Sequence, residues 1–464
     1  MEFLKELKAN ALVARTAVIA AIGGFLFGYD TGIISGALLY IKKDFHAGSA
    51  AQEFIVSSLL LGAVGGALLS GYLADRISRR NTKIISGTVY LVAALGCALS
   101  MNTGMLIGFR ALLGLAVGTA SFVSPLYISE VSPPRIRGGL TSFNQLATTS
   151  GILVAYLINY LFKDFAENWR WMLGVAAVPG AALAIGMFSV PKTPRWLVEQ
   201  RRDDDARDVL RKLRRGSADD DVDRELDAVR RSVESSRSAR ARDLLTGRAR
   251  PLLIVGVGLA FFQQFVGVNT IIYYAPTILQ QTGLSADSAV SQALSVGITN
   301  VVFTVVAVLL LDKVGRRPLL LTGTALLTVA LAGLGVYFAV PALRDSAPWM
   351  ALVALVLYIA AFAIGLGPVF WLMISEIFPQ TLRGTAMSVC TAVNWGANFA
   401  ISASFLSLAG WISRSGVFWI YTALGVVAWI FFSRRVPETR GKSLEDIQEE
   451  LGADTEAERE PKAA

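Results

Sequence analysis

Long apolar runs separated by short polar loops dominate the chain. About 20 apolar residues cross the roughly 30 Å of hydrocarbon in a bilayer, and a helix satisfies its own backbone hydrogen bonds there. Twelve such runs occur, at residues 17–40, 53–73, 84–101, 104–127, 139–161, 171–190, 251–280, 288–311, 318–340, 348–374, 384–409 and 415–433. The pattern therefore predicts an all-α integral membrane protein with twelve transmembrane helices.

A charged segment at residues 195–250 divides the apolar runs into two sets of six. It carries too many charges to enter a membrane, and its Arg and Asp pattern is typical of short solvent-exposed helices. We therefore expect a six-helix bundle at 1–194, a cytoplasmic helical linker at 195–250, a second six-helix bundle at 251–436 and a cytoplasmic tail at 437–464. The flank at residues 1–15 has the pattern of an amphipathic helix, so no signal peptide is expected.

Three loop motifs recur in the same order in the two halves. Asp75 to Arg80 returns as Asp312 to Arg317, Ser129-Glu130-Val131 with Arg137-Gly138 returns as Ser375-Glu376-Ile377 with Arg383-Gly384, and Pro191 to Arg195 is echoed by Pro437 to Arg440. One such match is expected of any positively charged loop. Three in register indicate an internal duplication, which is a mark of many secondary transporters.

Composition and charge support a membrane protein. Of 464 residues 54% are hydrophobic and 17% charged, and the mean hydropathy is +0.53, which is not a soluble balance. The net charge of +8 comes from Lys and Arg in alternate short loops: Arg76, Arg79, Arg80, Lys83, Arg135, Arg137, Lys313, Arg316, Arg317, Arg434, Arg435, Arg440 and Lys442. The positive-inside rule then places both termini in the cytoplasm, and no nucleic-acid partner is expected.

Few residues offer cofactor or catalytic chemistry. Cys97 and Cys390 lie inside apolar runs, so a disulfide is not expected, and His46 lacks the further ligands that a metal site needs. We find no phosphate-binding glycine loop and no nucleophile elbow in a suitable setting. We therefore expect no cofactor, no metal and no enzymatic activity.

The ordered loop motifs resemble those of the sugar porter family of the major facilitator superfamily, from about Gly23 to Lys442. That family includes bacterial proton-coupled xylose, glucose and inositol transporters and animal glucose facilitators. The resemblance implies the major facilitator fold, with two pseudo-symmetric six-helix bundles. The family usually has Pro-Glu-Ser-Pro-Arg after the sixth span, whereas this chain has Lys192 and Thr193 and lacks that carboxylate.

The charged loop residues also predict ion pairs between helix ends on the cytoplasmic side. Exposed pairs contribute only about 0–1 kcal/mol each, but several together could bias an equilibrium between two bundle arrangements. The alternative is that these charges only set topology. The resemblance favours a cytoplasmic latch made of Glu130, Arg137, Glu376, Arg383, Arg76 and Arg316.

Two charged residues lie well inside apolar runs. Asp30 is about ten residues from the outer end of the first span and Arg110 about six from that of the fourth, so the two could pair at similar depth. Intramembrane charges are costly and usually functional. A structural salt bridge is one interpretation. The other, which the resemblance favours, is a proton site in which protonation of Asp30 releases Arg110 and shifts the balance between outward-open and inward-open states.

The seventh span, at residues 261–274, carries amides deep in an apolar run. A straight helix would place Asn269 about 140° round from Gln264 and about 240° from Gln263, so the three would not converge. Gly267 could break the helix, as discontinuous transporter helices do at the bilayer midplane. The segment Gly365 to Trp371 indicates a similar break in the tenth span.

These amides favour a neutral polyhydroxy substrate. Amides both donate and accept hydrogen bonds, as hydroxyls do, and tryptophan offers a flat apolar face to a sugar ring. Gln and Asn can also merely join helices. By resemblance, the sugar-contacting positions are Gln145, Gln263, Gln264, Asn269, Asn300, Trp371, Asn394 and Trp395, the outer gate is Tyr273 and Tyr274, and Phe27 and Asn398 are secondary contacts.

From all this we expect a secondary transporter in the cell membrane, multi-pass and surrounded by lipid, that works as a monomer. It would import a monosaccharide or cyclic polyol by alternating access, coupled to proton symport. One alternative is a facilitative uniporter with the same site and no coupling. Another is a membrane sugar sensor that does not transport, with the charged segment at 195–250 as its output.

Overall fold

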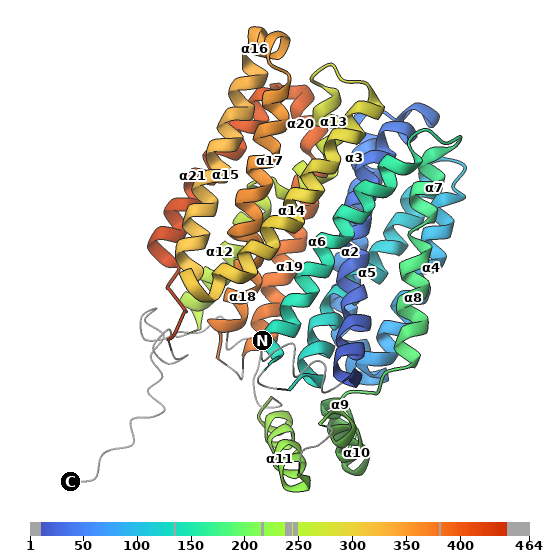
Figure 1. Ribbon diagram of the computed structural model, residues 1–464, viewed down its shortest axis with the longest axis vertical. Helices are drawn as coiled ribbons and strands as arrows, with labels where there is room; N and C mark the ends of the chain where they lie inside the picture. The colour runs from blue at the N-terminus through green and yellow to red at the C-terminus, as the bar shows by residue number, and fades with distance from the viewer. Residues whose placement is uncertain are drawn as a thin grey trace, which may run out of the picture.

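The computed structural model describes residues 11–133, 136–214, 218–236, 244, 249–379 and 382–442. The described residues form two helical bundles side by side, with three short helices beneath one end (Figure 1). We call the end that bears these short helices the linker end, and the opposite end the outer end. Both α2 and α21 have a terminus at the linker end (Figure 1).

Among the described residues, the N-terminal half and the linker contain ten helices. They are α2 (Ala11–Asp44), α3 (Ser49–Ile77), α4 (Arg79–Ala98), α5 (Thr103–Val131), α6 (Arg137–Phe162), α7 (Asn168–Gly174), α8 (Ala177–Phe188), and, in the linker, α9 (Pro194–Glu199), α10 (Asp203–Leu213) and α11 (Asp219–Ser236). Trp196 and Leu197 of α9 pack on apolar residues of α10 and α11, which gives the linker a small core of its own.

The C-terminal half supplies the remaining helices. They are α12 (Arg250–Phe265), α13 (Val268–Gln280), α14 (Ala286–Val314), α15 (Arg316–Ala339), α16 (Pro341–Ser346), α17 (Trp349–Ile364), α18 (Leu366–Glu376), α19 (Arg383–Ser402), α20 (Phe405–Ile412) and α21 (Arg414–Arg435). Residues 1–10 of the expected amphipathic flank and 443–464 of the expected tail lie outside the described part of the chain.

Ten helical segments of the described chain are long and apolar enough to cross a membrane. Two further segments complete the predicted twelve. One is α4, which begins with the charged residues Arg79 and Arg80, and the other is the α19–α20 pair, whose polar residues include Asn394 and Asn398. These charged and polar groups lower the hydropathy of both segments, and both segments pack within the bundles (Figure 1).

Several spans are broken into two helices. The seventh is α12 followed by α13, with Gly267 at φ 87° between them, and the tenth is α17 followed by α18, with Gly365 between them. Both predicted breaks are confirmed. The eleventh span is also broken, between Ser402 and Phe405, and the sequence pattern did not predict this break.

Small residues set how closely the helices approach. A Cβ atom at Gly114 of α5 would lie 1.9 Å from the Leu59 carbonyl oxygen of α3, and one at Gly28 of α2 would lie 1.8 Å from the Thr148 carbonyl oxygen of α6. Such close backbone contact is the usual way in which helices pack in lipid, where no hydrophobic effect draws them together. These contacts hold the N-terminal half as one bundle.

The duplicated loop motif has one strained copy. Gly315, between α14 and α15, has φ 101° and ψ 165°, and its counterpart Ser78, between α3 and α4, has φ 86° and ψ 151°. That region is essentially reserved for glycine, and other residues there cost about 1–3 kcal/mol. The Ser78 hydroxyl accepts a hydrogen bond from Asn81 N at 3.2 Å, which offsets part of this cost.

Replacing Ser78 with Gly is therefore expected to stabilise the protein by about 1 kcal/mol, because exchanging a serine cap for glycine costs only a few tenths. Thermal unfolding of the purified protein in detergent measures it. The matched variant Gly315→Ser should lower the melting temperature, since its Cβ would lie 2.6 Å from a Glu438 carboxylate oxygen. A Ser78→Gly protein that melts no higher than the wild type would contradict the strain.

Candidate sugar and proton sites

Four amide side chains form one hydrogen-bonded group in the C-terminal half, which we call the amide cluster: Gln263, Gln264, Asn269 and Asn394. Gln264 Nε2 donates to Asn394 Oδ1 at 3.1 Å, and Asn394 Nδ2 donates to Gln263 Oε1 at 2.7 Å. Asn269 Nδ2 donates to Gln264 Oε1 at 2.7 Å. Gln263, Gln264 and Asn394 are all buried, so their hydrogen-bonding groups must find partners within the protein or in a bound polar molecule.

The break at Gly267 is what lets the cluster form. Because α12 ends at Phe265 and α13 begins at Val268, Asn269 does not keep the angular position that a continuous helix would give it. The left-handed backbone of Gly267 turns the chain so that Asn269 reaches Gln264. A Cβ on Gly267 would also lie 2.7 Å from the ring of Tyr421, so glycine is required there on both counts.

Two tyrosines outside the predicted site support this break. Tyr358 of α17 donates its hydroxyl to the Val266 carbonyl at 2.9 Å, and so satisfies a backbone group that the broken helix leaves open. Tyr421 of α21 packs on Gly267, and its hydroxyl lies 3.5 Å from the Thr270 hydroxyl. Their position as single tyrosines in apolar runs could have identified them from the sequence, because a buried phenol hydroxyl needs a hydrogen-bond partner.

The other predicted sugar contacts lie on several helices. Trp395 of α19 packs edge-on against Phe27 of the opposite half, with ring centroids 5.1 Å apart. Trp371 of α18 packs in the same way against Phe370 at 4.7 Å. Gln145 is half-buried on α6 and Asn300 is buried on α14. The structure thus joins four of the eight predicted residues by hydrogen bonds and sets Trp395 against the N-terminal half.

The predicted gate tyrosines are both fully buried on α13. Tyr274 donates its hydroxyl to the Ser402 carbonyl at 3.2 Å, at the end of α19, and its ring stacks on Phe405 at 5.1 Å. Ser402 in turn donates to Asn398 Oδ1 at 3.1 Å. The side chain of Tyr274 therefore bridges α13 to the break between α19 and α20.

Asp30 and Arg110 form the buried pair that their depth in the sequence predicted. Arg110 Nη2 lies 3.4 Å from Asp30 Oδ2, and the two side chains are 0% and 1% exposed. Arg110 Nε also donates to the Ile55 carbonyl of α3 at 2.5 Å. One guanidinium thus connects α2, α3 and α5, which makes it sensitive to any change of charge on Asp30.

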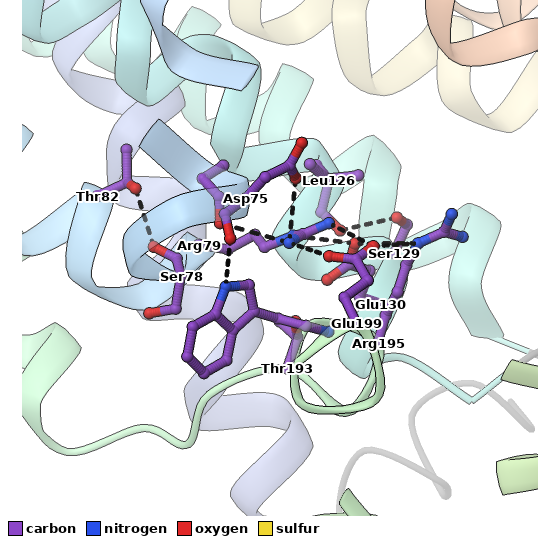
Figure 2. Close-up of polar contacts among 12 residues, drawn as sticks. Asp75, Ser78, Arg79, Thr82, Leu126, Ser129, Glu130, Thr193, Arg195 and Glu199 are labelled. Carbon is purple, nitrogen blue, oxygen red and sulfur yellow. Dashed lines mark hydrogen bonds and ion pairs between the residues drawn. The ribbon is translucent and has the colours of Figure 1, made fainter. Parts of the chain in front are cut away.

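At the linker end, Arg79 is the centre of an ion-pair network in the N-terminal half (Figure 2). Its guanidinium lies 3.3 Å from Glu130 and 2.7 Å from Glu199, and 3.3 Å from Asp75. Arg195 lies 3.2 Å from Glu199 and 4.0 Å from Glu130. This network ties α3, α4 and α5 to α9, the first helix of the linker.

The structure differs from the predicted latch at several residues. Arg79 rather than Arg76 approaches Glu130, and Arg76 instead donates to the Tyr72 hydroxyl one turn earlier on α3. The reason is that α3 ends at Ile77, so that Arg79 opens α4 and lies 4% exposed within the bundle. The side chain of Arg137 lies outside the described residues.

The C-terminal half carries a corresponding network. Arg316, the counterpart of Arg79, lies 3.0 Å from Glu376, the counterpart of Glu130. Thr439 donates to the other oxygen of Glu376 at 2.5 Å. Arg383, which was predicted to belong to the latch, donates to the Phe378 carbonyl at 3.3 Å. The duplicated motifs thus build the same Arg–Glu pair twice, and each of these pairs joins residues of one half.

The missing carboxylate after the sixth span marks a real difference between the halves. In the C-terminal half Glu438 accepts from the backbone N–H groups of Arg316 and Arg317 at 3.0 and 3.1 Å. Burial raises the pKa of Glu438, but these bonds and one from Arg440 N lower it overall. At the matching position Lys192 lies over the ring of Trp196 at 4.7 Å. The carboxylate that reaches the N-terminal network comes instead from Glu199.

The two bundles, their broken spans and their buried polar groups define a membrane transporter of the major facilitator fold. Over residues 16–451 the chain matches the family described as sugar (and other) transporters. The chain belongs to this family, and it is embedded in a membrane by multiple spans.

Its relatives include proteins that are named as sugar carriers. The chain is 39% identical to the galactose-proton symporter of Escherichia coli strain K12 over 449 residues, which covers 96% of each protein. It is 40% identical to the D-xylose transporter of Levilactobacillus brevis over 435 residues, which covers 94% of this chain and 95% of that one. The fold is similar to a partially occluded inward-open structure of the xylose transporter XylE from E. coli, with a TM-score of 0.82 at 31% identity, over 94% of this chain and 100% of that one.

Proposed function

We propose that this protein imports a monosaccharide or cyclic polyol together with a proton by alternating access. The observation that carries the proposal is the division of polar groups between the halves. The amide cluster lies in a broken span of one half, and the Asp30–Arg110 pair lies in the other. Buried amides and a buried charge pair are the two elements that a sugar–proton symporter needs.

Sugar binding is assigned to the amide cluster with Trp395 and its partner Phe27. Each amide offers both a donor and an acceptor, which matches a hydroxyl, and Gln145, Asn300 and Trp371 would complete the site from α6, α14 and α18. Tyr273 and Tyr274 are assigned to the outer gate. The names of several relatives specify galactose, xylose or glucose, which supports a monosaccharide over an anionic substrate.

Proton coupling is assigned to Asp30 and Arg110. A proton on Asp30 removes its charge and weakens its hold on Arg110, which also bonds to α3. The altered pairing changes the relative free energy of the outward-open and inward-open states, which is the only way in which a bound proton can drive transport. The linker-end networks around Arg79 and Arg316 are assigned to stabilising one of these states.

The orientation of the protein in the membrane is assigned from its basic loops. We assign the linker end and both termini to the cytoplasm, because the basic loops lie at that end and the positive-inside rule supports this orientation. We assign the four regions 1–194, 195–250, 251–436 and 437–464 as bundle, linker, bundle and tail. The protein works as a lipid-embedded monomer and catalyses no covalent reaction.

Uptake into protein-only liposomes tests the proposal. With a proton gradient imposed, we expect one sugar from a panel of pentoses, hexoses and inositols to accumulate above its external concentration. A facilitative uniporter would bring the same sugar only to equal concentrations. A sugar sensor would bind sugar without any flux, and either result would overturn proton-coupled import.

A further inference from the structure

A buried carboxylate at the outer end joins the two halves. Glu53, on the first turns of α3, is 4% exposed. Its two carboxylate oxygens accept from Ser407 of α20: one from the backbone N–H at 2.7 Å and the other from the hydroxyl at 2.5 Å. Since α3 belongs to the N-terminal half and α20 to the C-terminal half, these bonds must break whenever the outer ends separate.

The contact is a helix cap supplied by the opposite half. The first N–H groups of a helix have no partner within it, and the helix N-terminus carries a partial positive charge. Ser407 is the third residue of α20, which begins at Phe405, so its N–H is one of these groups. The Ser404 side chain at the cap position instead bonds back to Ala400. A carboxylate therefore satisfies both the charge and the geometry of this helix end.

The same break in the eleventh span is held from two sides. Tyr274 bonds to Ser402 just before the break and stacks on Phe405 just after it. Glu53 contacts Ser407 one half-turn further along α20. A movement of α20 away from α3 would therefore change the contacts of Tyr274, which is assigned to the outer gate.

Glu53 also lies close in sequence to Ile55, the α3 residue that the charge pair contacts. Arg110 donates to the carbonyl of Ile55, two residues after Glu53 on α3. A change in the Asp30–Arg110 contact therefore acts on the same helical turn that carries the cap. This gives the charge pair a direct mechanical connection to the outer inter-half contact.

Other outer contacts between the halves are of a different kind. Tyr40 donates to Asp287 at 2.8 Å, and Lys163 donates to Ser291 at 2.9 Å, both on α14 at partly open positions. Tyr156 donates to the Ile272 carbonyl at 2.8 Å and involves no charge. Glu53 combines burial with two charge-assisted bonds, which are stronger than neutral ones. Because α3 packs on both α19 and α20, the two halves are in contact at the outer end.

We propose that Glu53 is a positioning residue for transport, a carboxylate latch that holds the outer end closed by capping α20 of the opposite half. The proposal rests on the alternating-access part of the proposed function. In the outward-open state Glu53 would face water and α20 would lose its cap. Loss of the carboxylate therefore favours the outward-open state.

Hydrogen–deuterium exchange of the full-length protein in lipid nanodiscs, with no sugar and no proton gradient, tests this latch. In Glu53→Ala we expect a roughly 10- to 100-fold shift toward the outward-open state. Peptides from α13 and α20 should exchange faster, and peptides from the linker ends of α5 and α18 should exchange more slowly. Glu53→Gln keeps the shape of the side chain and one accepting oxygen, so the exchange rates of the same peptides should change by less. This variant also tests the latch if the alanine variant does not fold.

Glu167→Gln is the matched control, because Glu167 is an exposed carboxylate whose ion pair, with Arg170, stays within one half. It should leave all these peptides unchanged. Faster exchange confined to α20, with no change at the linker ends, would show a local cap and overturn the latch. Hydrogen–deuterium exchange needs no transport. A wild-type protein that failed to accumulate sugar would therefore contradict the proposed proton coupling, and the exchange rates would still test the Glu53 latch.

Discussion

Replacing Asp30 with Asn is expected to abolish proton-driven accumulation of sugar while exchange of sugar across the membrane persists. A proton that moves down 100 mV supplies about 2.3 kcal/mol, enough for roughly 50-fold accumulation. Asn has nearly the same shape as Asp but cannot take up the proton, so the ratio of internal to external sugar should fall to about one. Uptake and counterflow in liposomes under an imposed gradient measure the two activities separately.

The controls separate loss of coupling from loss of folding. Asn at position 30 leaves Arg110 with its bond to the Ile55 carbonyl, and retained counterflow would show that the variant is folded. Asp345→Asn is the matched change, because Asp345 is an exposed aspartate on α16, and it should accumulate sugar as the wild type does. An Asp30→Asn protein that still concentrated sugar would remove Asp30 from the coupling step.

Replacing Gln264 with Ala should weaken sugar binding about 5- to 150-fold while the protein remains folded. Gln264 bonds to Gln263, Asn269 and Asn394, and its loss removes the hydrogen-bond partner of Asn269 Nδ2 and of Asn394 Oδ1. A buried polar group left unpaired costs about 1–3 kcal/mol, and the same amide is lost to the sugar hydroxyls. Calorimetric titration of the purified protein with the transported sugar measures the dissociation constant.

Gln281→Ala is the control from the same span. Gln281 lies half-buried just after α13, at the end of the span opposite the amide cluster. Its replacement removes an amide of equal size and should leave sugar affinity unchanged. If both variants bound sugar as the wild type does, the cluster would be a helix-packing contact and the sugar site would lie elsewhere.

The sequence alone predicted the twelve spans, because the length of an apolar run follows directly from the thickness of a bilayer. It also located the breaks at Gly267 and Gly365, since glycine within an apolar run that carries buried amides signals an interrupted helix. The pairing of Asp30 with Arg110 followed from their similar depth. Each of these inferences depends on the position of a residue relative to the ends of its own span, which the sequence records well.

The sequence did not show how the helices are turned toward one another. Arg76 and Arg79 both belong to the motif Asp75 to Arg80, but the end of α3 at Ile77 and the start of α4 at Arg79 decide which one reaches Glu130. Glu53 stands at the start of a span, where a glutamate suggests a wet helix end, and its partner Ser407 is 354 residues away. Contacts of this kind depend on packing between the halves, which no local pattern contains.

The separation of the amide cluster from the charge pair has a consequence for how such proteins diversify. The cluster draws on α12, α13 and α19 of one duplicated unit, and the charge pair on α2 and α5 of the other. Substitutions that change selectivity among sugars can therefore accumulate in one copy without disturbing the energy source in the other. Descendants of a single ancestral carrier could change the sugar that they transport and keep proton coupling, or lose proton coupling and keep the same sugar.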